Sequence, residues 1–434
     1  MITLVSDTPF GDFPSDAFSA LDGADSAILV VADGVSSSTK SAFDHCINND
    51  IKMIVALNKM DKPHLNTNDI LDSMKESFNI NVVPIQVYDG EGTDFKGVES
   101  LLRLDDNGFV TRNQAEHLND AWEELTESVA SLDDELLIEY LENGEVEDGK
   151  IIAGLKNAVL EQQIIPVVYA SAINDIGVSE LMDATIAILP DPIVSREHTL
   201  RLAHKTAGDD AISKPGEEGG FAARVVHTSI DSFGSLSVVR VISNSRNHET
   251  GRFEPLPSEI VNLRTGEKMK LSSTVFGLCG KSRQALAEDA QILPGDVIAL
   301  PKVPDSICTN DIICSKMAVA SEENEMDIES ETKVLSPLSR HIPSISLMAS
   351  ATVAISDAGK ARQNQRQSGS GDDKLINALT ALSREDLAMK VEQKSGQWIV
   401  HCMSKDHLNL LVERLKDRYN VDVQLGDAPV GKFL

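Results

Sequence analysis

The chain has 434 residues, of which 41% are hydrophobic and 25% charged, an ordinary balance for a soluble globular protein. This length exceeds what one hydrophobic core supports, so we expect about three domains. The formal net charge of −29 excludes a general electrostatic attraction to DNA, RNA or an anionic membrane and is compatible only with a local basic face. No apolar stretch approaches about twenty residues, so the sequence predicts no membrane span.

The cysteines and the N-terminus bear on the compartment. Five cysteines are scattered, odd in number and without CxxC spacing, which indicates reduced thiols in the core. Met1 stands almost directly before the first predicted strand. We therefore expect no signal or transit peptide and no secretion.

The first 190 residues alternate short apolar runs with helical patterns, which is typical of a parallel α/β sheet. The predicted strands are rich in Val and Ile and cover residues 2–5, 27–32, 52–57 and 166–169. Between the third and fourth strands we expect an insertion at residues 82–165.

Part of this insertion is strongly acidic. Residues 116–148 hold thirteen acids and no Lys or Arg. Leucines recur there at helical spacing, at Leu132, Leu136, Leu137 and Leu141. The pattern predicts an acidic amphipathic helix whose polar side is a solvated face, with a partner-binding face as the alternative.

The rest of the chain divides by composition. Prolines at 190 and 192 end the first domain, residues 1–192, and a polar linker follows at 193–217. Residues 218–304 alternate apolar and polar positions between turn signals, which predicts a small antiparallel β-barrel. An acidic linker is expected at 305–340.

The last segment, residues 341–434, has the order strand, helix, strand, strand, helix, strand. This order is typical of the split βαβ, ferredoxin-like plan. A polar stretch at 358–372 interrupts it and is predicted to be a disordered loop. The loop carries Lys360, Arg362 and Arg366, for which a contact to RNA phosphates is an alternative to simple solvation.

The most informative motif is Asn58-Lys59-Met60-Asp61, which directly follows the apolar run at 53–57. A carboxylate at Asp61 can accept two hydrogen bonds at once, from the guanine ring N–H and the exocyclic amine, and adenine offers no such pair. Asn58 can brace the loop and face the base, and the Lys59 stem can lie over the ring. The motif predicts a guanine-binding loop at the end of a strand.

Two weaker motifs are its expected companions. Asp7-Thr8-Pro9 ends the first predicted strand, where Asp7 would hold a magnesium ion and the turn would contact the phosphates of a nucleotide. Ser171-Ala172 follows the strand at 166–169, where a backbone N–H could reach the guanine carbonyl. Each motif alone is a common turn sequence, and the spacing from Asn58 is what favours the site.

Together these residues resemble the elongation factor G family of translational GTPases. The similarity extends to the insertion through the run from Leu132 to Leu137, to the barrel through Gly234-Ser235-Leu236, and to the last domain through the run from Val412 to Lys416. The resemblance implies three parts: an incomplete P-loop-GTPase-like parallel sheet, an antiparallel β-barrel, and a ferredoxin-like split βαβ domain. It also implies GTP or GDP with Mg²⁺ as ligands, the ribosome as partner, a monomer, and a place in the cytoplasm or in an organelle such as a mitochondrion or plastid.

The sequence also departs from the family pattern. The 434 residues contain no G-x-x-x-x-G-K-[ST] phosphate loop, and Phe10 stands where the family has a glycine after Asp7-Thr8-Pro9. The resemblance therefore implies a chain truncated at both ends relative to the family, with a base pocket and without a phosphate pocket.

Two hypotheses follow from these departures. One is a GTP-binding factor for ribosomal translocation or ribosome recycling, and the other is a non-hydrolysing pseudo-GTPase that binds the ribosome or another partner. For the chain as given we expect weak nucleotide affinity and no turnover, because phosphoryl transfer depends on charge positioned around the phosphates.

Overall fold

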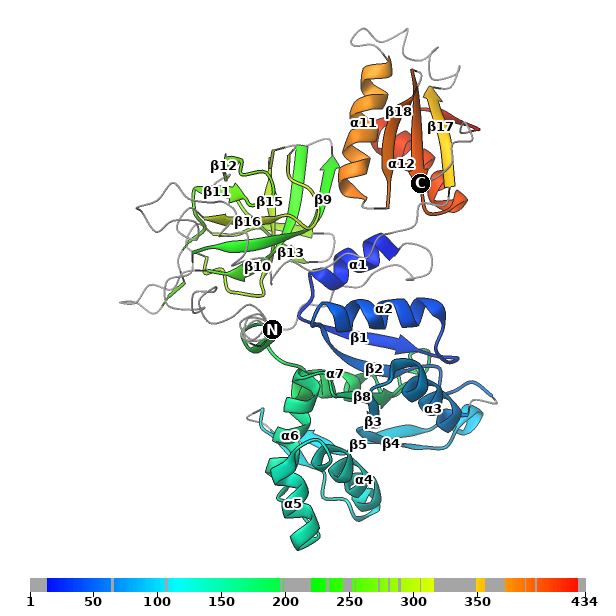
Figure 1. Ribbon diagram of the computed structural model, residues 1–434, viewed down its shortest axis with the longest axis vertical. Coiled ribbons are helices and arrows are strands. Elements are labelled where there is room, and N and C mark those ends of the chain that lie inside the picture. The colour runs from blue at the N-terminus through cyan, green and yellow to red at the C-terminus, as the bar shows by residue number, and fades with distance from the viewer. Residues whose placement is uncertain are drawn as a thin grey trace. The chain divides into compact units, whose positions relative to one another are not determined.

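Figure 1 shows the computed structural model of the chain. The structure describes residues 14–63, 66–105, 108–195, 198, 220–231, 234–244, 252–253, 255–271, 274–279, 282–287, 290–304, 306–315, 349–355, 371–386, 388–394 and 396–427. These residues fall into two compact units, one within residues 24–208 and the other within residues 1–23 and 209–434.

The first unit is built on a four-stranded parallel sheet in the order β1-β2-β8-β3. Its strands are β1 (Ser26–Val31), β2 (Lys52–Leu57), β8 (Ile164–Tyr169) and β3 (Asn81–Pro84). All six residues of β2 and of β8 are buried, as expected where helices cover both faces of a parallel sheet. The three predicted strands near residues 27, 52 and 166 are confirmed, and the predicted strand at 2–5 lies outside the described residues.

Helices pack on this sheet and begin at capping residues. The helices that contact its strands are α2 (Ser37–Asn48), α3 (Thr67–Phe78), α4 (Asn119–Ala130), α6 (Asp148–Leu160) and α7 (Val178–Ile188). The Ser36 side chain accepts a hydrogen bond from the Thr39 N–H at 3.1 Å and so begins α2. Asn79, in the left-handed conformation at φ 53°, ends α3.

The predicted insertion needs a correction at its start. Residues Asn81–Pro84 form β3 and pair in parallel with β8, so the first residues assigned to the insertion belong to the sheet. The chain then forms the hairpin of β4 (Gln86–Asp89) and β5 (Gly97–Ser100), with the short helix η1 (Gly92–Asp94) at its tip. A second hairpin follows, made of β6 (Leu102–Leu104) and β7 (Val110–Arg112).

The acidic segment forms two helices, α4 (Asn119–Ala130) and α5 (Asp134–Asn143). Asp133 starts α5, because its carboxylate accepts the N–H of Glu135 at 2.9 Å. The expected apolar face is wrong in part: Leu136 is 9% exposed, whereas Leu141 is 74% exposed and Leu132 precedes the helix. Only part of the leucine pattern therefore marks the core.

The second unit contains an eight-stranded antiparallel sheet in the order β12-β11-β16-β9-β10-β15-β13-β14. Its strands are β9 (Ala222–Asp231), β10 (Gly234–Ser243), β11 (Glu259–Asn262), β12 (Lys268–Lys270), β13 (Phe276–Cys279), β14 (Ser282–Ala285), β15 (Val297–Pro301) and β16 (Ile312–Ser315). The antiparallel plan is confirmed, and the pairings among the described residues leave β12 and β14 at the two ends of the sheet. Helix α1 (Pro14–Asp22) packs against β9, where Arg224 Nη1 donates to the Asp22 carbonyl at 3.1 Å.

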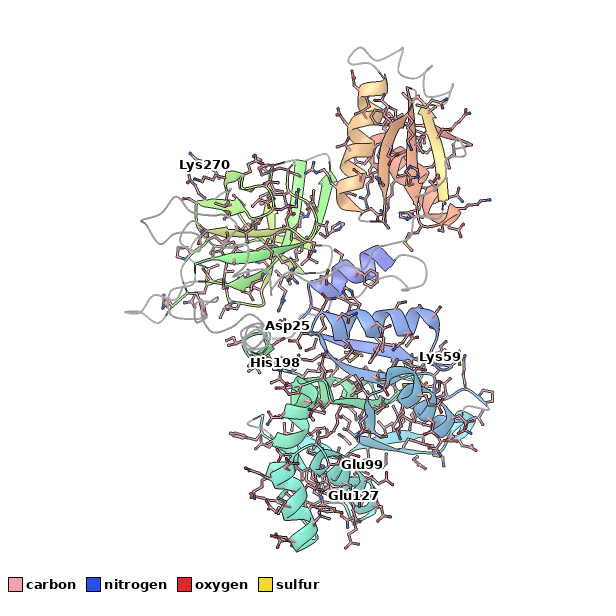
Figure 2. The ribbon with its side chains drawn as sticks, in the orientation of Figure 1. Asp25, Lys59, Glu99, Glu127, His198 and Lys270 are labelled. Atoms are coloured by element: carbon pink, nitrogen blue, oxygen red, sulfur yellow. The ribbon has the colours of Figure 1, made fainter. Side chains whose placement is uncertain are left out.

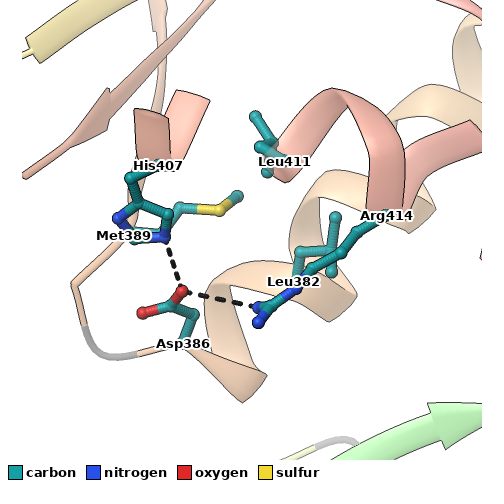
Figure 3. A pocket seen from close by; sticks show the side chains of 6 residues that line it. All are labelled: Leu382, Asp386, Met389, His407, Leu411 and Arg414. Carbon is teal, nitrogen blue, oxygen red and sulfur yellow. Dashed lines mark hydrogen bonds and ion pairs between the residues drawn. The ribbon is translucent and has the colours of Figure 1, made fainter. Parts of the chain in front are cut away.

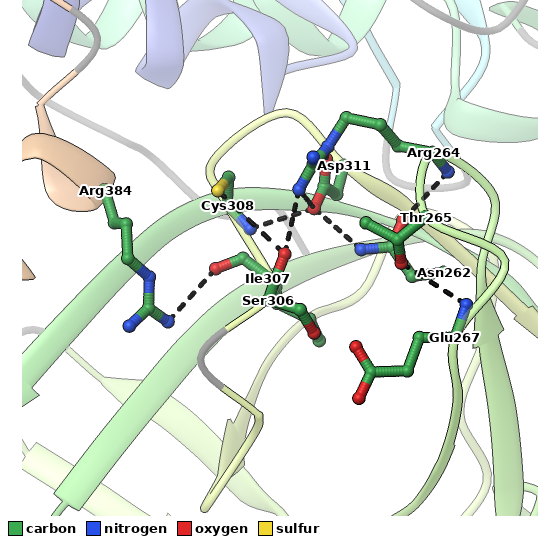
Figure 4. Close-up of polar contacts among 9 residues, drawn as sticks. All are labelled: Asn262, Arg264, Thr265, Glu267, Ser306, Ile307, Cys308, Asp311 and Arg384. Carbon is green, nitrogen blue, oxygen red and sulfur yellow. Dashed lines mark hydrogen bonds and ion pairs between the residues drawn. The ribbon is translucent and has the colours of Figure 1, made fainter.

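A hydrogen-bonded cluster of polar groups closes the loop that precedes β16 (Figure 4). The buried Asp311 carboxylate accepts hydrogen bonds from Arg264 Nε at 2.6 Å and from Asn262 Nδ2 at 2.8 Å. The backbone N–H of Cys308 donates to the same carboxylate at 2.9 Å. This pairing raises the pKa of the Arg264 guanidinium and leaves Asp311 with a structural role.

The second unit also holds the ferredoxin-like domain. It consists of β17 (Ala349–Ile355), α11 (Gly371–Glu385), β18 (Lys390–Lys394), β19 (Gln397–Cys402), α12 (Lys405–Tyr419) and β20 (Val423–Asp427). The sheet order β18-β19-β17-β20, antiparallel throughout, is the split βαβ arrangement that the sequence pattern predicts. The predicted loop at 358–372 is too long by two residues, because α11 begins at Gly371; its basic side chains lie outside the described residues.

No helix among the described residues is both long and apolar enough to cross a bilayer.

Candidate functional site

The site is formed by the two loops that leave β2 and β8 at their carboxyl ends. These strands are adjacent and parallel, with Leu57 opposite Tyr169, so both loops start at the same edge of the sheet. Backbone hydrogen bonds continue beyond the strands, from the Ala170 N–H to the Leu57 carbonyl at 2.9 Å and from the Met60 N–H to the Ala170 carbonyl at 3.2 Å. The fold therefore brings together two motifs that lie 110 residues apart.

Asn58 ties the two loops to each other. Its side-chain oxygen accepts the Lys59 N–H at 2.8 Å and the Ala172 N–H at 3.0 Å. Because both partners are donors, the amide orientation is fixed with Oδ1 toward the backbone. The Nδ2 group then contacts no acceptor among the described residues and stays available for a ligand.

Asp61 is oriented by the second loop. The hydroxyl of Ser171, a residue with no exposed surface, donates to Asp61 Oδ1 at 2.5 Å. Asp61 is half-buried, and its other carboxylate oxygen meets no donor within the part of the chain that the structure describes. One oxygen is thus occupied by Ser171 and one is open to a ligand.

Lys59 gives the loop its shape. Its backbone is left-handed, with φ 65°, which is uncommon for a residue with a side chain. The turn directs the Met60 side chain into the core, where it has no exposed surface, and leaves Lys59 exposed. Strained backbone of this kind is found where the surrounding structure fixes a functional loop.

The second loop is closed by its own backbone. Ser171 and Ile176 exchange two hydrogen bonds, with N–O distances of 2.9 and 3.1 Å. Gly177 then turns the chain into α7 with φ 79°, and a Cβ there would lie 2.2 Å from the Tyr169 carbonyl oxygen. Only glycine fits at this position, so the sequence Ser-Ala-x-x-x-x-Gly fixes the loop.

The structure thus places Asn58, Lys59, Asp61, Ser171 and Ala172 in one site. A backbone N–H of the second loop was expected to reach the base carbonyl, and of these the Ala172 N–H donates to Asn58 Oδ1. Asp7, Thr8 and Pro9 lie outside the described residues, so the predicted magnesium and phosphate contacts stay predictions. No group of three His, Cys, Asp or Glu side chains suited to a metal ion occurs among the residues that are described.

Sequence reasoning missed an ion pair at the same edge of the sheet. Lys62 Nζ lies 3.0 Å from both carboxylate oxygens of Asp33, which follows β1. The hydrogen bond from Lys62 lowers the pKa of Asp33, and the charges of Lys62 and Lys59 add to the effect. The rule that parallel strands end at one edge could have found this pair, because Asp33 and Lys62 both follow strand ends.

A second cluster, in the ferredoxin-like domain, is structural. Figure 3 shows the Asp386 carboxylate between His407 and Arg414. Asp386 Oδ2 lies 2.8 Å from His407 Nε2 and 3.7 Å from Arg414 Nη1, and the three residues with Leu382, Met389 and Leu411 fill the space between α11 and α12. These groups pair with one another inside the domain core, which gives them a structural role.

Two parts of the chain match models of known families. Residues 3–191 match the Elongation factor Tu GTP binding domain, and residues 365–427 match Elongation Factor G, domain III. Elongation factor G of Thermotoga sp. (strain RQ2) is 29% identical over 444 residues, which cover 98% of this chain and 58% of the relative. Elongation factor G of Thermotoga maritima is 28% identical with the same coverage.

The comparison with solved structures agrees with these sequence matches. A crystal structure of a protein from Thermus thermophilus matches with a TM-score of 0.70 at 21% identity, over 97% of this chain and 56% of that chain. At this identity the match shows the fold alone. The chain spans less than two thirds of the length of the relatives that it matches.

The sheet, its two loops and the first family match define the class, an α/β domain of the GTP-binding type followed by further domains. Within that class, the chain combines a match to the Elongation factor Tu GTP binding domain with one to Elongation Factor G, domain III, and it is similar to elongation factor G over 98% of its length.

Proposed function

We propose that this chain recognises guanine through Asn58 and Asp61 and acts on the ribosome, in translocation or in ribosome recycling. One observation carries the first part: Ser171 orients Asp61 by one oxygen while the other oxygen stays open. An open carboxylate oxygen beside the free Asn58 Nδ2 matches the donors and acceptor on one edge of guanine. The ribosomal part rests on the name of the relatives, elongation factor G.

The residues present fit the base of GTP or GDP better than its phosphates. Asn58, Asp61 and the exposed Lys59 stem would hold the base, and bound GTP would supply the phosphoanhydride bond between its β- and γ-phosphates that the family hydrolyses. The 434 residues contain no G-x-x-x-x-G-K-[ST] loop, which elsewhere supplies backbone N–H groups and a lysine to the phosphates. We therefore infer that these residues bind the nucleotide weakly and do not turn it over.

A change of base preference tests the recognition step. Xanthine has a carbonyl where guanine has the exocyclic amine, so an Asn at position 61 would donate to xanthine and lose a charged acceptor for guanine. We expect the native chain to prefer guanosine over xanthosine by about tenfold or more, since a hydrogen bond to a charged group contributes about 1.5–3 kcal/mol. Asp61→Asn should reverse the preference, measured by saturation-transfer NMR.

Asp33→Asn is the matched control for this experiment. It removes a carboxylate at the same edge of the sheet that is held by Lys62, so the preference for guanosine should persist. Equal binding of guanosine, xanthosine and adenosine by the native chain would contradict the recognition step.

A second measurement tests the missing phosphate contacts. If only the base is held, GDP and guanosine should bind with affinities within a few fold of each other in calorimetric titrations. Sub-micromolar binding of GDP, or release of phosphate from GTP, would contradict this part of the proposal.

The second hypothesis, a non-hydrolysing pseudo-GTPase that binds the ribosome, is favoured by the absent phosphate loop. Sedimentation with purified ribosomes separates the two functions. Binding that is independent of added nucleotide is expected for the pseudo-GTPase, and binding that requires GTP is expected for a translocation or recycling factor.

A further inference from the structure

The hairpin of β4 and β5, residues 86–100, contacts both loops of the proposed guanine site, the loop that follows β2 and the loop that follows β8. The Gly92 N–H at its tip donates to the Met60 carbonyl at 3.0 Å, one residue before Asp61. At the first residue of the hairpin, the Gln86 side-chain oxygen accepts the Tyr169 N–H at 2.9 Å, two residues before Ser171. Each recognition loop is therefore bonded to the same hairpin.

The contact at the tip requires glycine. Gly92 has φ 60°, and a Cβ there would lie 3.0 Å from the Lys62 carbonyl oxygen, a backbone atom that belongs to the loop itself. The Met60 residue is bonded on both sides, through its N–H to Ala170 and through its carbonyl to Gly92. The Met60 side chain is fully buried as well. Met60 therefore fixes the position of the backbone that leads into Asp61.

The Gln86 contact takes the place of a backbone hydrogen bond between two strands. Beyond β3, the Ile85 N–H still donates to the Val167 carbonyl at 3.0 Å, and the chain then leaves the sheet. The next free N–H of β8, that of Tyr169, is taken by Gln86, which is 2% exposed. The Tyr88 ring packs edge-on against Tyr169, with centroids 4.8 Å apart.

The hairpin is itself rigid. The Lys96 N–H donates to the Asp89 carbonyl at 2.9 Å, and the Tyr88 hydroxyl donates to Glu91 at 2.7 Å. Gly90 has φ 76° and no room for a side chain, because a Cβ would lie 2.0 Å from the Asp94 carbonyl oxygen. Such a tip can hold the loop that it touches in one position.

We propose that this hairpin is a positioning element for the base site, with Gly92 and Gln86 as positioning residues that align Asp61 with Ser171. The two ends of the hairpin are held together, since the Leu101 N–H donates to the Ile85 carbonyl at 2.9 Å. The binding readout rests on the proposed guanine recognition, whereas the exchange readout described next does not.

Amide hydrogen exchange of the full chain tests the positioning without any ligand. In Gly92→Ala the amides of Met60 and Lys62, which donate to Ala170 and Lys59, should exchange at least about tenfold faster. Gly108→Ala is the matched control, because Gly108 has φ 81° with nothing within 4 Å of its Cβ position, so it carries the same backbone strain without a contact. Unchanged exchange of Met60 and Lys62 in Gly92→Ala would overturn the proposal.

A second variant covers the case in which Gly92→Ala fails to fold. Gln86→Leu keeps the volume and removes the acceptor for the Tyr169 N–H, so exchange of the Tyr169 and Ala170 amides should rise by a similar factor. If those amides exchange as in the native chain, the hairpin does not position the second loop and the proposal is overturned.

Binding separates this inference from the proposed function. Gly92→Ala should lower the preference for guanosine over adenosine about tenfold, whereas Gly108→Ala, which carries the same backbone strain without the contact, should leave this preference unchanged. If the native chain shows no preference but the loop amides still respond, guanine recognition fails and the positioning stands. If the native preference is present and Gly92→Ala leaves it unchanged, the positioning fails alone.

Discussion

The two ends of β2 carry polar residues in opposite situations. At the carboxyl end, Asn58 and Asp61 lie on a half-exposed loop and keep one polar atom each without a partner among the described residues. At the amino end, Lys52 has no exposed surface and its ammonium group is hydrogen-bonded to Asp50. His198 lies against the same pair, and Figure 2 shows it at the other end of the sheet from Lys59.

The difference lies in how fully the charges are paired. His198 Nδ1 lies 3.2 Å from Asp50 and 3.3 Å from Lys52, and His198 Nε2 lies 3.2 Å from Glu161. A buried charge without partners would be too costly to keep, and Lys52 is paired with Asp50, so this pair serves the fold. A polar group that retains an open hydrogen-bonding atom at the surface can instead serve a ligand.

The largest effect is expected at the buried end. Lys52→Ala leaves the Asp50 carboxylate without its ammonium partner and should lower the free energy of unfolding by about 3–5 kcal/mol. Urea unfolding, followed by the fluorescence of Trp122 in a Trp398→Phe background, measures this change in the first unit. Asp44→Ala removes an exposed pair with Lys40 and should cost about 0.5 kcal/mol or less, and equal losses in the two variants would contradict the contrast between the two ends of β2.

An intermediate effect is expected at Asn58. Asn58→Ala removes the acceptor for the Lys59 and Ala172 N–H groups, which contact solvent once released, so the unfolding free energy should fall by only about 1–2 kcal/mol. Guanosine affinity, measured by NMR titration, should fall at least about tenfold. Asn58→Asp keeps the acceptor and should retain the loop, so a stability loss in Asn58→Asp as large as that of Lys52→Ala would contradict the assignment of this end to binding.

The smallest effect is expected at the Asp33–Lys62 pair. The pKa of Asp33 is lowered in the folded chain, so this pair stabilises the fold above the ordinary value of 3.8 and the contribution disappears as the pH falls below it. Lys62→Ala should return the pKa of Asp33 toward 3.8, as a carboxyl-carbon NMR titration would show. The unfolding curve should hardly move, because both side chains are exposed and screened; a large shift in it would show that this end of β2 also serves the fold.

Local sequence patterns predicted much of the fold and the residues of the two loops after β2 and β8. The apolar run before Asn58 predicts a buried strand, and the order of strands and helices after residue 341 predicts the ferredoxin-like sheet. These patterns failed where the burial of a side chain or the pairing of a strand depends on residues that are distant in the sequence. Leu141 fits the helical spacing as well as Leu136, yet it meets solvent, and residues 81–84 join the sheet because β8 offers them an edge.

The sequence by itself determined which groups we propose for guanine recognition, because Asn, Lys and Asp after a strand have their chemistry whatever surrounds them. Only the tertiary structure decided that Ser171 orients Asp61, that Gly92 and Gln86 hold the two loops, and that Lys52 is enclosed with Asp50 and His198. The reason is physical: these are hydrogen bonds between residues far apart in the chain, and their partners are set by which strands lie side by side.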